Sequence, residues 1–403
     1  MGSVRAVSVP APVDGLDTLL TTRLRRAPSG GGLERRTATV LLDCGEAGAW
    51  TVVLDRGRAS VRRGAAPTWT LRVRCTAAVL AELVAGRASA VLAFLDGRVV
   101  VRGDLSLAMA LDGLFGADVA DGRPRAREVE AMGVRTSYLE AGPADAPPVL
   151  LLHGLGATGA SMLPVLADLM VDHRVLAPDS PGFGASDAPR GPYTPAWFAA
   201  WIEAFQRATG SRGSVLVGNS LGGRIALEAG LTRPGSVRAV VLLAPSPAFR
   251  RLRQYVPFVR LVTPRLGALP VLMHSRMAAE GLKAMFSDPS RLPDTWFDAY
   301  ADEMVRVLAE RAHRVAFLAC ARQIYLEDAY GQHGFWQRLP GLLPPALFLW
   351  GDRDRLVPSS FARHVADALP SAGQVVLEDC GHVPQFEHPL ETMAMLRGFL
   401  EHV

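Results

Sequence analysis

The sequence predicts two domains: a smaller α+β domain, followed by an α/β domain whose parallel sheet is interrupted by a helical insert. After residue 128, strand-like and helix-like segments alternate, which is typical of a parallel sheet with helices on both faces. Residues 1–120 instead combine short strands, tight turns and helices. Between the two patterns lies a polar, charged segment with Gly and Pro, residues 121–127, which we expect to be a linker.

Short apolar runs separated by turn signals define the first domain, residues 1–120. An Asp-Arg-Gly sequence at residues 55–57 indicates a hairpin turn, and an Asp-Gly turn predicts a second hairpin over Val91–Val101. Apolar residues at helical spacing predict helices over Ala77–Ala85 and Leu105–Phe115. The remaining predicted strands are Thr37–Leu42, Trp50–Leu54, Ala59–Arg62 and Trp69–Val73.

The second domain, residues 128–403, shows the alternation more clearly. Between residue 246 and about residue 340 the strand pattern stops, and irregular and helical stretches predict a helical cap. The predicted strands are Val149–Leu152, Val175–Ala177, Ser214–Val217, Val237–Leu243, Ala346–Trp350 and Gln374–Leu377, and the predicted helices are Met162–Leu169, Pro195–Ala208 and Leu221–Ala229. The cap contains apolar residues suited to covering an acyl pocket, or simply to packing on the domain below: Met273, Met277, Met285, Phe286, Trp296, Phe297 and Met304.

Composition excludes several classes of protein. Apolar residues make up 49% of the chain and charged residues 20%, so the sequence can form large cores and is neither disordered nor collagen-like. The four cysteines are scattered, which fits a reducing compartment better than a disulfide scaffold. The first residues lack the apolar segment of a secretory signal, and no apolar run approaches a membrane-spanning length. We therefore expect a cytoplasmic protein.

The charge distribution leaves one question open. The net charge is only +4, but arginines outnumber carboxylates in the first third of the chain. Two interpretations stand: weak association of this basic domain with an anionic membrane surface, or an ordinary solvated arginine-bearing surface. No nucleic-acid-binding motif is present, so a nucleic-acid partner is not expected. The sequence does not indicate an oligomeric state.

Candidate catalytic chemistry begins with Gly218-Asn-Ser220-Leu-Gly222, which directly follows a predicted strand and opens a predicted helix. Such a strand–turn–helix context is the one in which a G-x-S-x-G sequence exposes a nucleophilic serine. Only small neighbours fit around so tight a turn, and the Leu221 N–H, at a helix N-terminus, is placed to bind an oxyanion. We expect Ser220 to be the nucleophile.

A serine hydroxyl needs a base, and the base needs a carboxylate to orient it. His382 follows the predicted strand Gln374–Leu377, and Asp354 follows the predicted strand Ala346–Trp350. The order Ser, Asp, His matches a known arrangement of such triads. We therefore expect Ser220, Asp354 and His382 to form a catalytic triad.

These motifs resemble those of the α/β-hydrolase-fold serine hydrolases over residues 128–403. Leu152-His153-Gly-Leu155-Gly156 is similar to the HGxG oxyanion loop of that family, and the resemblance implies Leu155 as a second oxyanion donor beside Leu221. Asp179-Ser-Pro-Gly-Phe-Gly-Ala-Ser186 is similar to another family loop, and the G-x-x-D pattern points to Asp354 rather than Asp352 as the acid. The implied activity is hydrolysis of a carboxylic ester, or a thioester, through an acyl-enzyme.

Other functions stay open at this level. The G-N-S-x-G-G form also resembles carbon–carbon bond hydrolases, although those favour a different oxyanion loop and a Trp after the catalytic His, where this chain has Val383. The same residues would catalyse acyl transfer to an alcohol if the cap excluded water. A non-catalytic lipid carrier is a further alternative. No metal-ligand spacing and no nucleotide-binding loop occur, so neither a metal nor a cofactor is expected.

The first domain resembles the sterol-carrier-protein-2 type of lipid-binding domain. The resemblance rests on a helix ending at Gly86, the segment Ala93-Phe94-Leu-Asp-Gly97, and Val101-Arg-Gly-Asp104 before an apolar final helix. It implies a lipid-like ligand, and thereby an apolar, lipid-like ester substrate for the whole chain. Candidate lipid-binding residues are Phe94, Leu107, Leu111 and Phe115, whose alternative role is ordinary core packing.

Overall fold

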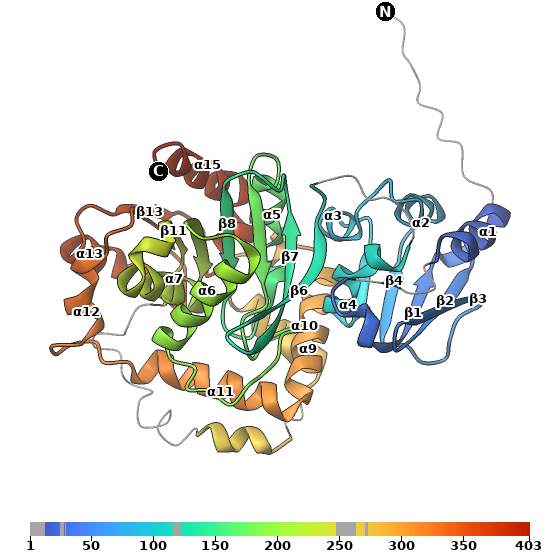
Figure 1. Ribbon diagram of the computed structural model, residues 1–403, viewed down its shortest axis with the longest axis horizontal. Helices are drawn as coiled ribbons and strands as arrows, with labels where there is room; N and C mark the ends of the chain where they lie inside the picture. The colour runs from blue at the N-terminus through green and yellow to red at the C-terminus, as the bar shows by residue number, and fades with distance from the viewer. Residues whose placement is uncertain (1–12, 25–27, 29, 116–121, 247–262, 271–272) are drawn as a thin grey trace, which may run out of the picture. The chain divides into compact units, whose positions relative to one another are not determined.

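The computed structural model describes residues 13–24, 28, 30–115, 122–246, 263–270 and 273–403 (Figure 1). Residues 1–12, residues 120–121 at the expected domain boundary, and residues 247–262 of the expected cap lie outside the described part. The chain divides into two compact units, Met1–Ala120 and Asp121–Val403. Within the described residues, no helix is both long and apolar enough to cross a bilayer.

The first unit is built on a five-stranded sheet in the order β3-β2-β1-β4-β5. Its central strand β1 pairs antiparallel with β2 and parallel with β4, and most side chains of β1 and β2 are buried. The strands are β1 (Thr37–Asp43), β2 (Ala49–Asp55), β3 (Arg58–Arg63), β4 (Leu71–Arg74) and β5 (Val100–Gly103). The helices are α1 (Val13–Arg23), α2 (Ala77–Val84), α3 (Ala90–Leu95) and α4 (Leu105–Met109).

Two local predictions for this unit are wrong. The hairpin expected over Val91–Val101 is the helix α3 followed by β5. The Asp112 carboxylate accepts hydrogen bonds from the Ala90 N–H and the Ser89 hydroxyl, so a residue distant in sequence satisfies the helix N-terminus. The helix expected over Leu105–Phe115 ends at Met109 and continues as a 3₁₀ turn, in a segment that contains the poor helix former Gly113.

The second unit contains an eight-stranded sheet in the order β13-β12-β11-β10-β8-β9-β7-β6. The six strands from β13 to β9 are parallel, as expected, but β7 and β6 extend the sheet antiparallel. These two strands were not expected from the sequence, and residues 125–127 of the expected linker belong to β6. The missed signal is the turn at Met132-Gly133, where both residues have positive φ, between two strand-length segments. The strands are β6 (Arg125–Ala131), β7 (Val134–Ala141), β8 (Pro148–Leu152), β9 (Arg174–Pro178), β10 (Ser214–Asn219), β11 (Val237–Leu243), β12 (Ala346–Gly351) and β13 (Gly373–Leu377).

The connections between these strands fix where a site can form. From β8 the chain moves to β9 on one side, whereas from β10 it moves to β11 on the other. Because such crossovers are right-handed, the helices α5 and α7 lie on opposite faces of the sheet. The carboxyl ends of β8 and β10 thus flank the point where the strand order reverses, which is the usual ligand site of open α/β sheets. The helices of the sheet layers are α5 (Leu163–Leu169), α6 (Pro195–Thr209), α7 (Leu221–Thr232), α13 (Phe361–Ala368), α14 (Pro384–Glu387) and α15 (Pro389–Leu400).

Between β11 and β12, the described residues form helices joined by turns and loops, and they include no strand. The α-helices there are α9 (Ser275–Lys283), α10 (Asp294–Ala309), α11 (Arg311–Leu326) and α12 (Phe335–Arg338). α9 packs against α10, and their contact continues into a small apolar cluster that includes Phe286, Phe297 and Val383. Val383 belongs to the loop after β13, so the cap is packed directly onto the loop that carries His382.

Candidate active site

Ser220 lies at a sharp turn between the fully buried strand β10 and the helix α7. Its backbone has φ 52° and ψ −113°, a region that non-glycine residues rarely occupy. Such strain persists only where the surroundings enforce it, and it clusters at functional sites. The side chain of Ser220 lines a cavity above the sheet, so the turn presents the hydroxyl to that cavity.

The glycines of the motif have the steric role expected from the sequence. A Cβ on Gly218 would lie 2.4 Å from the carbonyl oxygen of Gly222. A Cβ on Gly222 would lie 2.2 Å from the carbonyl oxygen of Leu152, at the end of β8. The absence of side chains at both positions therefore lets α7 start directly against β8 and the loop that follows it.

His382 and Asp354 come from the ends of the neighbouring strands β13 and β12. The His382 Nδ1 lies 2.7 Å from the Asp354 Oδ2, and both side chains are buried. Asp354 Oδ1 accepts further hydrogen bonds from the N–H groups of Leu356 and Val357. Asp352 instead accepts from the Cys380 N–H. The carboxylate of Asp354 thus fixes Nδ1 as the protonated nitrogen and leaves Nε2 to act as a base.

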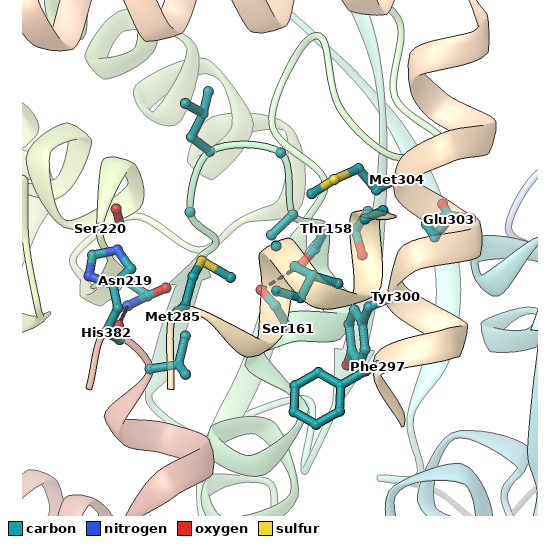
Figure 2. A pocket seen from close by; sticks show the side chains of 18 of the residues that line it. Thr158, Ser161, Asn219, Ser220, Met285, Phe297, Tyr300, Glu303, Met304 and His382 are labelled. Atoms are coloured by element: carbon teal, nitrogen blue, oxygen red, sulfur yellow. Dashed lines mark hydrogen bonds between the residues drawn. The ribbon is translucent and has the colours of Figure 1, made fainter. Parts of the chain in front are cut away.

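The three expected triad positions meet around one cavity. Figure 2 shows Ser220 and His382 on the same wall, with Tyr300 and Glu303 across from them. Asp354 lies behind His382, hydrogen-bonded to it. The three side chains expected to act as nucleophile, base and orienting carboxylate thus lie at the carboxyl edge of the sheet, with Ser220 and His382 on the cavity wall.

The loop after β8 contributes the second side of the site. Leu155 lines the cavity, and a Cβ on its neighbour Gly154 would lie 3.4 Å from the Ser220 Cβ. Leu221 is the first residue of α7, so its N–H has no acceptor within the helix. The two N–H groups expected to bind an oxyanion therefore belong to segments that flank Ser220 closely.

His153 joins this loop to the loop after β9 through hydrogen bonds at both ring nitrogens. Its Nδ1 donates to the Gly154 carbonyl oxygen at 2.8 Å, and its Nε2 accepts from the Ser180 N–H at 2.8 Å. Burial lowers the pKa of His153 to about 4, so the ring is neutral near pH 7 and both nitrogens are used.

Asp179, in the loop after β9, hydrogen-bonds to two backbone segments near the same site. Its carboxylate accepts hydrogen bonds from the N–H groups of Gly159 and Ala185, each at 2.8 Å. Burial raises the pKa of Asp179 to about 6. A Cβ on Gly184 would lie 2.2 Å from an Asp179 carboxylate oxygen, which explains why the loop keeps a glycine there.

The cavity has a volume of about 440 Å³ and is mostly apolar. The cap helices α9 and α10 supply much of its wall, and the carboxyl edge of the sheet supplies the rest. Among the described residues that line it there is no arginine and no lysine, and Glu303 carries the single carboxylate. The seven apolar cap residues singled out in the sequence all line it: Met273, Met277, Met285, Phe286, Trp296, Phe297 and Met304.

The four candidate lipid-binding residues of the first domain do not belong to this cavity. Phe94, Leu107, Leu111 and Phe115 are each at most 4% exposed, within the first unit. Their burial fits either role left open by the sequence, because residues around an internal ligand and ordinary core residues are both shielded from water.

Several polar residues of the site were not expected from the sequence. Asn219, already part of the motif, donates from Nδ2 to the carbonyl oxygens of Leu243 and His382. Its place beside the nucleophile was the available signal. Tyr300 donates from its hydroxyl to the Ala160 carbonyl oxygen at 2.6 Å, and Glu303 pairs with Arg306. Nothing in the local sequence distinguishes these cap residues from those of an ordinary amphipathic helix.

Comparison with known families agrees with this geometry. Residues 147–389 match the family described as alpha/beta hydrolase fold, and residues 20–116 match the SCP-2 sterol transfer family. A 2-hydroxy-6-oxo-6-(2'-aminophenyl)hexa-2,4-dienoic acid hydrolase from Metapseudomonas resinovorans is 28% identical over 68% of this chain and 90% of its own length. A pimeloyl-[acyl-carrier protein] methyl ester esterase from Xylella fastidiosa (strain 9a5c) is also 28% identical, over 63% of this chain and 95% of its own length.

Solved structures give the same fold. A membrane phospholipase A, described as a bacterial virulence factor, is 28% identical with a TM-score of 0.59, covering 69% of this chain and 86% of its own. A putative lipase from Acinetobacter baumannii AYE is 23% identical with a TM-score of 0.58, covering 69% and 91%. The fold class expected from the sequence is confirmed. The chain belongs to the α/β-hydrolase fold family, with a domain of the SCP-2 sterol transfer family preceding the hydrolase domain.

Proposed function

We propose that this hydrolase cleaves carboxylic esters, thioesters included, of apolar, lipid-like acyl groups through an acyl-enzyme. The Ser220 Oγ attacks the carbonyl carbon while His382 Nε2 takes its proton, and the N–H groups of Leu155 and Leu221 bind the oxyanion. His382 then gives the proton to the departing alcohol. Water, deprotonated by the same nitrogen, releases the acid and restores Ser220.

The observation that carries this proposal is the apolar cavity beside Ser220. Its wall combines methionine, phenylalanine, leucine and tryptophan side chains, and the catalytic groups lie at one end. Burying a methylene group in such a wall is worth about 0.8 kcal/mol, so binding energy grows with the length of an acyl chain. Substrates with long apolar acyl groups are therefore favoured.

The electrostatics of the wall argue against the carbon–carbon hydrolase alternative. The relative from Metapseudomonas resinovorans is named for a dienoic acid, which carries a carboxylate. A buried carboxylate needs a cationic or well-placed donor partner. The described lining offers no arginine or lysine, and its single carboxylate, Glu303, is paired with Arg306. A neutral ester, like the methyl ester named for the Xylella relative, fits the wall better.

The N-terminal domain is proposed to hold or deliver the lipid substrate. This step rests on its membership of a sterol transfer family and on its covalent linkage to the hydrolase domain, which raises the local concentration of a shared ligand. Deletion of residues 1–120 should then weaken turnover of long-chain esters and leave short-chain esters unaffected. Equal kinetics on long esters would refute delivery. Binding of this domain to anionic lipid vesicles stays a prediction, testable by co-sedimentation.

We place this activity in the cytoplasm as a further part of the proposal. All four cysteines are free thiols in the described residues. Cys44 and Cys75 directly follow Asp43 and Arg74, which are paired in the strands β1 and β4, a proximity that would favour disulfide formation in an oxidising compartment. Counting reactive thiols in protein isolated under non-reducing conditions tests this: four supports a reducing compartment, and two contradicts it.

The direct test is release of p-nitrophenol from acyl esters of increasing chain length. The native chain should show kcat/KM rising with acyl length, and Ser220→Ala should abolish turnover. Ser371→Ala, an exposed serine outside the cavity, is the matched control and should retain full activity. Activity restricted to acetyl esters would contradict the lipid-like substrate, and Ser220-independent turnover would contradict the mechanism.

A further inference from the structure

The loop that carries His382 is bridged to the cap by one buried carboxylate. Glu387, on the short helix α14, is 5% exposed. Its Oε1 accepts a hydrogen bond from the Gly381 N–H at 2.9 Å, beside His382. Its Oε2 accepts from the Ser287 N–H at 2.7 Å, in the segment between the cap helices α9 and α10. A single side chain thus joins two backbone segments that are almost a hundred residues apart.

Other contacts strengthen the same junction. The His382 N–H donates to the Met285 carbonyl oxygen at 2.8 Å, and the Ser287 hydroxyl donates to the Asp379 carbonyl oxygen. A Cβ on Gly381 would lie 2.5 Å from the Met285 carbonyl oxygen, so the two backbones approach as closely as a glycine allows. The Met285 side chain lines the cavity near His382 (Figure 2).

The nucleophile turn holds His382 from the opposite side. Asn219, next to Ser220, donates from Nδ2 to the His382 carbonyl oxygen at 3.1 Å. Asp354 accepts from the imidazole Nδ1. The backbone N–H, the backbone carbonyl and the ring of His382 are therefore each held by a different segment. Of these three, only the N–H is held by the cap, and Glu387 is the side chain that hydrogen-bonds to the backbone on both sides of that contact.

Burying a carboxylate at this point is costly unless its partners require one. Two N–H donors face Glu387, one on each oxygen. A glutamine has one acceptor oxygen and one NH₂ group. Its oxygen would accept from one N–H, and its NH₂ group would face the other N–H without a hydrogen bond. The Arg291 guanidinium, which donates to the Glu387 carbonyl oxygen at 3.3 Å, brings a positive charge to the same residue. The contacts are thus specific for a carboxylate.

We propose that Glu387 is a positioning residue that holds the His382 loop against the cap segment Met285–Ser287. The cap thereby helps to position the catalytic base. This inference rests on the proposed function, because Glu387 affects catalysis only through His382. Glu387 touches neither the reacting atoms nor the cavity wall. It acts by keeping the His382 imidazole aligned with the side chains of Ser220 and Asp354.

The test compares Glu387→Gln with Glu378→Gln, the same change at an exposed glutamate in the same loop region. With p-nitrophenyl esters of medium chain length, Glu387→Gln should lower kcat by about 10- to 100-fold, the scale of a misplacement of about 1 Å. KM should change less than kcat, because Glu387 itself does not line the cavity. Denaturant unfolding curves of each variant measure any unfolded fraction, for which kcat is corrected.

A second comparison, made in the Asp354→Ala variant, distinguishes loss of His382 positioning from general structural damage. In Asp354→Ala, where the base has already lost its orientation, adding Glu387→Gln should cause little further loss, since residues that act through one group are not additive. Glu387→Asp keeps a carboxylate that can still reach one donor, and should recover part of kcat. If Glu387→Gln does not fold, Glu387→Asp carries the same comparison.

Three results would overturn the inference: unchanged kcat in Glu387→Gln, an equal loss in Glu378→Gln, or the full loss repeated in the Asp354→Ala background. The failure of the proposed function is distinguishable from these results. In that case the native chain itself shows no Ser220-dependent ester turnover, and the comparison of variants is not reached.

Discussion

Replacing Gly222 with alanine should damage both the stability and the catalysis of the hydrolase domain. Gly222 is the second residue of α7, two residues after Ser220, and its Cα faces the end of β8. An added Cβ would lie 2.2 Å from the Leu152 carbonyl oxygen, 2.6 Å from the Leu152 carbonyl carbon and 2.8 Å from the His153 carbonyl oxygen. All three are backbone atoms, so no side-chain rotation relieves the contact.

The size of the effect follows from these distances. Contacts of this kind below 3.0 Å are essentially never observed, so α7 and the loop after β8 must separate by roughly 1 Å. Overpacking a core typically costs about 1–3 kcal/mol of unfolding free energy. The separation also moves the Leu155 N–H away from Ser220, and a shift of about 1 Å can lower the rate by about 100-fold.

Denaturant unfolding and ester kinetics measure the two effects on the same protein. Gly398→Ala is the control, because Gly398 lies within the helix α15 and a Cβ there meets nothing within 4 Å. That change should stabilise the protein by up to about 1 kcal/mol through helix propensity, with unchanged activity. If Gly222→Ala matched the native chain in both stability and kcat/KM, the close approach of α7 to β8 would not be needed for the site.

Three further predictions concern burial and charge. Arg224→Met should cost about 2–3 kcal/mol in denaturant unfolding, because the buried Arg224 pairs with Glu228 and Glu327 and only Arg338 would remain near these carboxylates. The exposed Arg207→Met should cost little. Burial lowers the pKa of His153 from 6.5 to about 4, so its stabilising effect is complete above pH 6.5 and is lost as the pH falls through 4. That loss is about 3 kcal/mol, and unfolding curves for His153→Gln should lack this part of the pH dependence. Ala278→Trp should place an indole in the cavity and lower kcat/KM for long-chain esters at least about tenfold relative to acetyl esters, as chain-length kinetics would show.

The parts of the fold that the sequence predicted are those with local signals. The parallel strands are short apolar runs bounded by turns, and the elbow at Ser220 is defined by glycines within two residues of it. By contrast, α3 depends on Asp112 capping the helix from a distant turn, and no local pattern reveals that contact. The strands β6 and β7 carry more polar residues than the central strands, and their pattern is correspondingly weaker.

The same distinction applies to the candidate site. Ser220, Asp354 and His382 were found because each follows a strand within a recognisable motif, and the carboxyl ends of parallel strands meet at one edge. The choice of Asp354 over Asp352 rested on resemblance, and the hydrogen bond to His382 now gives it a geometric basis. Glu387 carried no such signal, because its role depends on Ser287 in the cap, which is distant in sequence.

The central claim is that Ser220 carries the acyl group during turnover, and mass spectrometry of the quenched enzyme tests it most directly. After brief reaction with a p-nitrophenyl ester, trypsin should release the segment from Gly213 to Arg224, which contains Ser214 and Ser220. We predict that this peptide gains the mass of the acyl group, that fragmentation places it on Ser220, and that Ser220→Ala carries none. An acyl group on any other residue, or turnover with no acylated peptide, would contradict the account.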